Sequence, residues 1–260
     1  TGTLTFGGAD AAAANSDTAP VSTINLDGAI NLGAAATELT SIVFNGGPGV
    51  GETLTVDTTG DGVRINGVVT LNSSVAITTG AAAAGDITFT NDSPIDAQGG
   101  ESNDLTLTAG TGSVFFNEDI GAVESIGALT ITRADGGVVF GQADTETAGT
   151  GTTGPVNTVS TDDAIDIGST NVITGGIVLN GAATGIMFQT SSDTIRLNGP
   201  VTLNSDVTID TDENDADTNA EGANVTFTVG STIDSQDGGA TTEANSLTID
   251  AGVASVFFNG

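Results

Sequence analysis

The stretch LTLTAGTGSVFFN, residues 105–117, returns as LTIDAGVASVFFN, residues 247–259. In both copies apolar residues alternate with other residues, and a glycine lies between the two runs. Such alternation predicts strands with one buried face, because successive side chains of a strand point to opposite sides. We therefore expect two short strands around a turn, with Val114 and Phe116 pointing inward and Phe115 pointing outward.

Further matches extend this repeat through the chain. DGVRINGVVTLNSSVAI, from Asp61, matches DTIRLNGPVTLNSDVTI, from Asp193, and LTFGGAD, from Leu4, matches VVFGQAD around Phe140. The separation between matched residues grows only where loops lengthen. The chain therefore divides into two copies of one long unit, residues 1–134 and residues 135–260, the second continuous with the first and shorter at its C-terminal end.

The spacing of the strands predicts the architecture. Short runs of Val, Ile, Leu and Phe recur about every 20 to 30 residues, the scale of one coil of a parallel β-solenoid. A representative coil is LTLTAG, SVFFNE and DIGAVESIG, and we expect roughly nine or ten coils in a rod about 45 Å long. The alternative is a sandwich or an antiparallel barrel, which would favour a larger aromatic core, whereas Phe is the only aromatic residue. Five Asn-Gly pairs, which begin at Asn45, Asn66, Asn180, Asn198 and Asn259, are expected corners where asparagines of successive coils form a hydrogen-bonded ladder.

Composition excludes several classes of partner. The chain has 33 acidic and 3 basic residues, a net charge of −30, and no His, Cys, Trp or Tyr. Three arginines cannot supply the basic surface that nucleic acid or anionic lipid requires. No apolar run approaches a membrane span, so we expect neither a nucleic-acid partner nor a membrane span. Clustered carboxylates instead suit hard divalent cations.

The alternating segments NSLTIDAGVASVFFNG, IGALTITRADGGVVFG and NGVVTLNSSVAITT resemble the strand repeats of very large bacterial surface proteins of the filamentous-haemagglutinin and autotransporter-adhesin type. The resemblance covers essentially the whole chain, and these repeats share no catalytic motif. It implies a right-handed parallel β-helix, an extracellular location at the cell surface, and a structural or adhesive role.

An acidic loop is the candidate metal site. In DTDENDADTNAE, residues 210–221, oxygen-bearing side chains occupy the spacing of an EF-hand calcium loop, at Asp210, Asp212, Asn214, Thr218 and Glu221. Asp215 stands where that motif needs glycine, so a true EF-hand is not expected. A calcium loop of another geometry and a solvated acidic insertion both stay open, and no cofactor is expected to be required.

The outward positions of the strands form the candidate interface. If Phe115 points outward, its counterparts are expected to form an apolar patch, which either a loop of the same chain or another rod would cover. The expected interface residues are Phe115, Val43, Val139, Val178, Met187 and Phe257. Arg64 and Arg196 share this position and are expected to pair with carboxylates of neighbouring coils.

Two further patterns have ordinary explanations. Thr-x-Thr runs resemble an ice-binding surface, but threonine also suits the wet side of any strand. Paired carboxylates could serve a glycosidase or lyase, but an arginine that is repeated in both copies indicates architecture. The sequence therefore predicts a non-enzymatic structural protein, a segment or protomer of a filament, sheath or adhesin stalk that contacts copies of itself. The alternative is an adhesin module that binds a glycan or a cell surface through its long loops.

Overall fold

The computed structural model describes residues 2–7, 21–33, 37–46, 53–80, 82, 85–141, 155–182, 184–212, 221–228, 230–235 and 245–260. Over these residues it contains strands, turns and bends, and no helix. All pairings between the strands are parallel. The prediction of an all-β chain built from parallel sheets is therefore confirmed.

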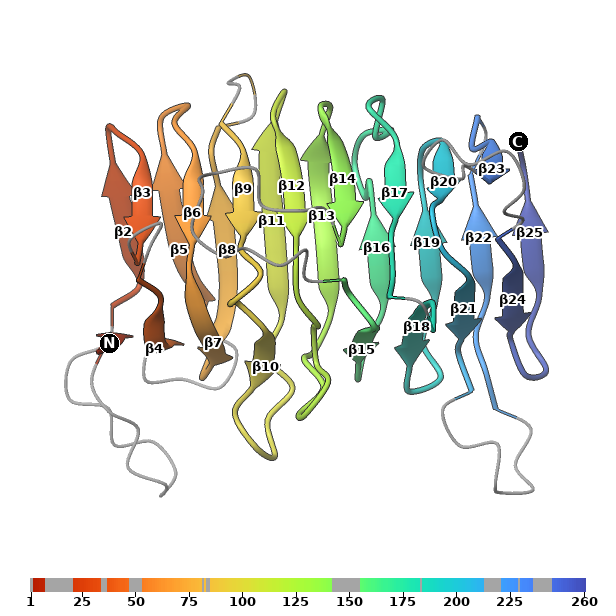
Figure 1. Ribbon diagram of the computed structural model, residues 1–260, viewed down its shortest axis with the longest axis horizontal. Coiled ribbons are helices and arrows are strands. Elements are labelled where there is room, and N and C mark those ends of the chain that lie inside the picture. Colours follow the sequence, from red (N-terminus) through yellow and green to blue (C-terminus); the bar gives the residue numbers. More distant parts are fainter. Residues whose placement is uncertain are drawn as a thin grey trace.

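Three faces run along the elongated molecule (Figure 1). Sheet A contains β1 (Thr3–Phe6), β4 (Leu39–Phe44), β7 (Gly67–Leu71), β10 (Ile95–Ala97), β15 (Thr158–Thr161), β18 (Ile186–Thr190), β21 (Val207–Asp210) and β24 (Leu247–Asp250). Sheet B contains β2 (Thr23–Leu26), β5 (Thr53–Thr58), β8 (Ser74–Thr78), β11 (Leu105–Gly110), β13 (Leu129–Ala134), β16 (Ile165–Ile167), β19 (Ile195–Leu197), β22 (Val225–Phe227) and β25 (Val256–Phe258). Sheet C contains β3 (Ile30–Leu32), β6 (Val63–Ile65), β9 (Ile87–Phe89), β12 (Ser113–Phe116), β14 (Gly137–Phe140), β17 (Ile177–Leu179), β20 (Val201–Leu203) and β23 (Ile233–Ser235).

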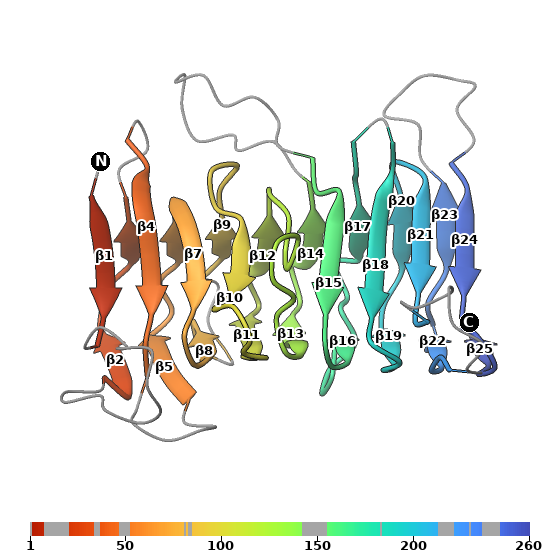
Figure 2. The same cartoon turned by 90° about the horizontal axis from the view of Figure 1, so that it is seen from below.

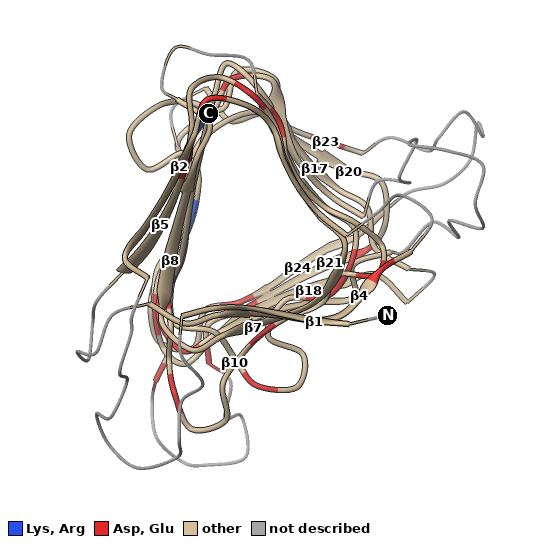
Figure 3. Cartoon of the chain, turned by 90° about the vertical axis from the view of Figure 1, so that its left-hand side faces the viewer, with Lys and Arg blue, Asp and Glu red and all other residues tan. Residues whose placement is uncertain are grey.

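The chain visits the sheets in the order A, B, C and returns to sheet A one strand further along. Figure 2 looks onto sheet A, and Figure 3 shows that the three faces enclose a triangular cross-section. Between β10 and β15 sheet A continues through Ile120, which bridges Ile95 on one side and Val159 on the other. The expected coil is thus found, since β11 and β12 are followed by this bridge and then by β13.

The interior is filled by the inward-pointing side chains of the strands. Val114 and Phe116 are fully buried and Phe115 is partly exposed, as the alternation predicts. Phenylalanines stack along the interior, with ring centroids 5.3 Å apart between Phe89 and Phe116 and 5.1 Å apart between Phe116 and Phe140. Equivalent side chains of successive coils therefore contact one another directly.

The corners are held by side chains that reach the next coil. Asn66 accepts a hydrogen bond from Thr90 Oγ1 (2.7 Å), and Gly67 N donates to Ser93 Oγ (3.1 Å), which in turn donates to the Ile65 carbonyl (2.8 Å). The second copy repeats this corner with the set Asn198, Thr228, Gly199, Ser231 and Leu197. The predicted ladder of asparagines on asparagines is wrong at these corners, because threonine and serine of the next coil provide the partners.

The matched stretches of the two copies lie on different sheets. In the first copy β6, β7 and β8 belong to sheets C, A and B, whereas their counterparts β19, β20 and β21 belong to sheets B, C and A. Each of these strands of the second copy therefore lies on the sheet that precedes, in the order A, B, C, the sheet of its counterpart. We call this a displacement of the second copy by one face. Sheet B continues from β13 to β16 across residue 135, where the sequence places the boundary of the repeat.

Candidate functional site

The residues of the predicted metal loop are only partly described. Asn214 and Thr218 lie outside the described residues, and Asp210, Asp212 and Glu221 flank the corner between sheets A and B. Asp210 Oδ1 accepts a hydrogen bond from Asp212 N (2.8 Å), and Glu221 Oε2 accepts one from Ser192 Oγ (3.4 Å). Within the described ranges no three His, Cys, Asp or Glu side chains form a group that could hold a metal ion. Calcium binding by this loop stays a prediction.

The expected interface residues do not form one patch. Phe115, Val139 and Val178 are neighbours in register on the outer side of sheet C, and all three are partly exposed. Val43 and Met187 lie on sheet A, in its two separate four-stranded stretches, and Phe257 lies on sheet B. The expected interface residues therefore comprise a three-residue stripe on sheet C, two separate residues on sheet A and one on sheet B.

Arg133 and Arg196 each form an ion pair with an aspartate. Arg196 pairs with Asp166 on the neighbouring strand of sheet B, as predicted for neighbouring coils. Arg133 pairs instead with Asp135 of its own turn, and this contact lowers the pKa of Asp135. Both pairs are partly exposed, so solvent screens them and each contributes little to stability.

Carboxylates gather at the corners, where Figure 3 shows most of the acidic segments in red. Burial raises the pKa of Asp163, and the charges of Asp193, Asp104 and Asp162 raise it further. Burial also raises the pKa of Glu118, and the hydrogen bond that Asp119 N donates to Glu118 Oε2 (3.3 Å) offsets part of this increase. In contrast, hydrogen bonds from the backbone N–H and the hydroxyl of Ser246 lower the pKa of Asp206. The corners thus concentrate negative charge without the cationic groups that would bind an anion.

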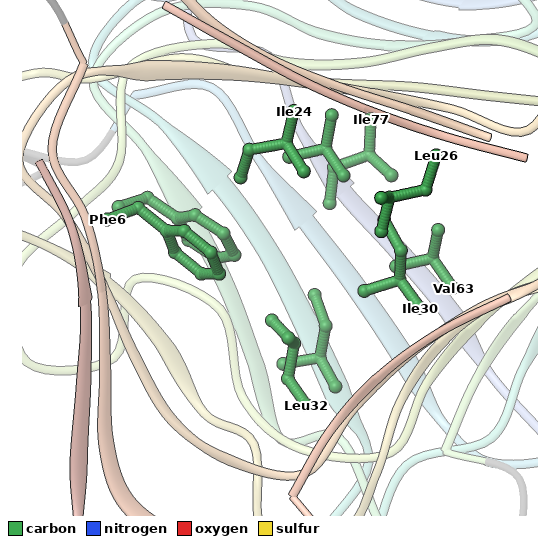
Figure 4. A pocket seen from close by; sticks show the side chains of 10 residues that line it. Phe6, Ile24, Leu26, Ile30, Leu32, Val63 and Ile77 are labelled. Atoms are coloured by element: carbon green, nitrogen blue, oxygen red, sulfur yellow. The ribbon is translucent and has the colours of Figure 1, made fainter. Parts of the chain in front are cut away.

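One end of the molecule is open and apolar. The outer edges of β1, β2 and β3 have no strand beside them in the described residues, and we call this the N-terminal end surface. A cavity of about 90 Å³ opens there (Figure 4), lined by Phe6, Ile24, Leu26, Ile30, Leu32, Phe44, Val56, Val63, Ile65 and Ile77. Leu26 is 47% exposed, although its position is an inward one. The end surface therefore presents the interior of the rod to solvent.

The opposite end is also uncovered. The C-terminal end surface comprises the outer edges of β23, β24 and β25, which likewise have no neighbouring strand in the described chain. Phe258 stacks on Phe227 with ring centroids 5.1 Å apart, but its other side is open and it is 60% exposed. Its counterpart in the first copy, Phe116, is fully buried between two rings.

Comparisons with family models, with curated proteins and with solved structures give no significant match to this chain. No helix in the described part of the chain is long and apolar enough to cross a membrane.

Proposed function

We propose that this chain is a segment of a right-handed parallel β-helix that acts as a rigid, non-enzymatic structural rod in an extracellular filament, sheath or adhesin stalk. The observation that supports this function best is the continuous parallel pairing of strands along all three sheets. Side chains of successive coils also contact one another along the interior, as the stacked rings of Phe89, Phe116 and Phe140 illustrate. Each coil is therefore held to the next by backbone hydrogen bonds and by buried apolar contacts.

The proposal of a right-handed coil rests on a general rule. Parallel strands joined by a crossover in one sheet are right-handed in nearly all known proteins. Here each crossover runs through the other two sheets before the chain returns. A rod of this kind is stiff, because each coil pairs its backbone with the coils on both sides and its side chains stack along the interior.

The extracellular location and the resemblance to filamentous-haemagglutinin-type repeats are part of the same proposal. They are supported by the alternating repeats, which carry the resemblance. Copies of itself are the proposed partners, and no cofactor is required.

A longer chain tests the proposal. Because Asn259 matches Asn117, residues 1–259 can be joined directly to residues 118–260, which adds one repeat of fourteen strand positions. Small-angle X-ray scattering should show a particle of unchanged width that is longer by roughly 22 Å, at three positions per coil and about 4.8 Å per coil. A wider particle, or added residues that do not fold, would contradict the proposal.

Binding of a glycan or a cell surface is the second candidate function. It is favoured by corner segments that leave the sheets, such as residues 98–104, which are longer than the turn at residues 72–73 of the preceding coil. Glycan arrays with the intact chain and with a variant whose segment 98–104 is shortened compare the two functions. Binding that is lost while the fold is kept would support the adhesin module, and no binding by either chain would support the rod.

A further inference from the structure

The outer side of sheet C is a single row of side chains. Most strands of this sheet are three residues long, so each presents one outward side chain between two inward ones. Neighbouring strands are in register, and the outward side chains therefore line up along the rod. From β6 to β23 this sheet C row comprises Arg64, Thr88, Phe115, Val139, Val178, Thr202 and Asp234.

The sheet C row carries less negative charge than the outward sides of the other two sheets. Its one acidic residue is Asp234, although the chain has 33 acidic residues. Outward strand residues include Asp96 and Asp210 on sheet A, and Asp57 and Asp166 on sheet B. Sheet C is therefore the face through which two copies of this acidic chain repel each other least.

The order of residues along the row makes it complementary to itself. Val139 is the middle residue, and in each direction it is followed by an apolar residue, a threonine and a charged residue. The two charges at the extremes are opposite, since one is Arg64 and the other is Asp234. A two-fold axis parallel to the strands at the level of Val139 therefore brings unlike charges of two copies together and apolar residues together.

We propose that two copies of this chain pack side by side through the sheet C row, with their rods antiparallel and Val139 of one copy facing Val139 of the other. This inference rests on the proposed rod function and specifies how one rod contacts another laterally. The contact uses the outer faces of the strands and none of their edges, so it does not depend on the ends of the rod. The other facing pairs are Phe115 with Val178, Thr88 with Thr202 and Arg64 with Asp234.

Other arrangements of the same two faces are less favourable. If the rods were parallel, each residue would face its own copy, which places Arg64 opposite Arg64 and Asp234 opposite Asp234. Like charges directly opposite one another are destabilising. If antiparallel rods were shifted by one coil in either direction, Arg64 would lose Asp234, and Phe115 or Val178 would face a threonine. Only the proposed register pairs the unlike charges and keeps apolar residues against apolar residues.

The contact is narrow, so the association is weak. Three residues of a strand span about 10 Å and the six spacings of the row span about 29 Å, so each copy buries roughly 300 Å². A standard interface buries about 800 Å² per partner, and dimers are therefore expected only at roughly 0.1 mM or more. Asp61 and Asp86, which precede β6 and β9 at the adjacent corner, strengthen the repulsion at low salt.

Reversal of the two charges tests which residues face each other. Arg64→Asp and Asp234→Arg each place like charges opposite one another, so each should weaken dimer formation at least about tenfold. The chain with both substitutions has unlike charges again and should regain the affinity of the natural chain. Val43→Asp, at an outward position of sheet A, is the control and should leave dimer formation unchanged. Sedimentation at up to roughly 1 mM protein in about 0.15 M salt measures all four chains, and a double variant that stays monomeric would overturn the pairing.

Cross-linking tests the antiparallel direction, since the natural chain has no cysteine. Facing sheets lie about 10 Å apart, so a bismaleimide of similar reach should link Thr88→Cys to Thr202→Cys. That mixture should react at least about tenfold faster than either chain alone, because identical cysteines then lie four coils apart, about 19 Å along the rod.

Faster linking of either cysteine chain alone would indicate parallel rods and overturn the proposed contact. Absence of dimers of the natural chain, together with absence of linking, would overturn lateral docking through sheet C. The longer-chain scattering experiment decides the rod function separately, since it measures a single chain at low concentration.

Discussion

Two corners of the molecule have the same hydrogen bonds but lie between different sheets. One contains Asn66 and Ser93, and the other contains Asn198 and Ser231. The first lies between sheets C and A, and the second lies between sheets B and C. The same holds for Phe116 on sheet C and its counterpart Phe258 on sheet B. Local sequence therefore specifies a strand, its inward residues and the following corner, while the face on which they lie depends on how many strands precede them.

The largest expected difference between the copies is at these phenylalanines. Phe116→Ala should destabilise the chain by about 3 to 5 kcal/mol, because it leaves a cavity between the rings of Phe89 and Phe140. Phe258→Ala should cost about 1 kcal/mol or less when the chain is dilute, because Phe258 is already mostly exposed. Urea unfolding at low protein concentration measures both. Equal losses would contradict the open C-terminal end surface.

Loss of the serine should destabilise the chain at both corners. Ser93→Ala leaves the Gly67 N–H without its acceptor, and Ser231→Ala does the same to the Gly199 N–H. Each variant should lose about 1 to 3 kcal/mol, because a buried donor then lacks a partner. Ser93 should show the larger loss, since its coil lies further from an open end. A loss at only one site, measured by the same urea unfolding, would mean that the corner depends on its face.

A smaller, pH-dependent difference is expected at a third matched site. Ser74 in the first copy accepts a hydrogen bond from Asp104 N (3.1 Å), and Asp206 in the second copy accepts one from Ser246 N (2.7 Å). These hydrogen bonds lower the pKa of Asp206 below its ordinary value of 3.8, so their stabilisation is present above pH 3.8 and is lost as the pH falls through the folded pKa. Asp206→Ser should therefore slightly lower the unfolding midpoint at pH 7.

That decrease should be smaller than the effect of either serine variant, because Asp206 is exposed to solvent. It should also shrink as the pH is lowered below 3.8, the ordinary aspartate pKa. Thermal unfolding at pH 7 and pH 3 measures it, with Ser74→Ala as the neutral control. A decrease for Asp206→Ser that does not change with pH would show that the carboxylate charge is not involved.

Much of the fold could be predicted from sequence, because the alternation of residues within each strand indicates which side of the strand is buried. The alternation in SVFFN correctly placed Phe116 inside and Phe115 outside, and glycine and asparagine marked the corners. The repeat also located the matched strands. What alternation does not contain is the count of strand positions between copies, so the displacement by one face could not be predicted.

The relative positions of the expected interface residues could not be predicted from sequence for the same reason. Phe115, Val139 and Val178 lie side by side because three successive strands of sheet C are in register. Val43, Met187 and Phe257 have the same pattern in their strands, yet lie on other faces. Exposure of Leu26 and Phe258 depends on the absence of a neighbouring strand, which no local pattern records.

Disulfide trapping within the chain tests the one-face displacement most directly. Asp166 and Thr130 are neighbours in register on sheet B, so the Thr130→Cys, Asp166→Cys chain should oxidise rapidly to an internal disulfide. The control is the Val139→Cys, Asp166→Cys chain, whose cysteines lie on different sheets. In the sequence repeat, β16 is the counterpart of β3, which lies on sheet C. If the strands of the second copy lay on the same sheets as their counterparts, Asp166 would lie on sheet C beside Val139. We expect the first disulfide and not the second, and the reverse result would contradict the one-face displacement.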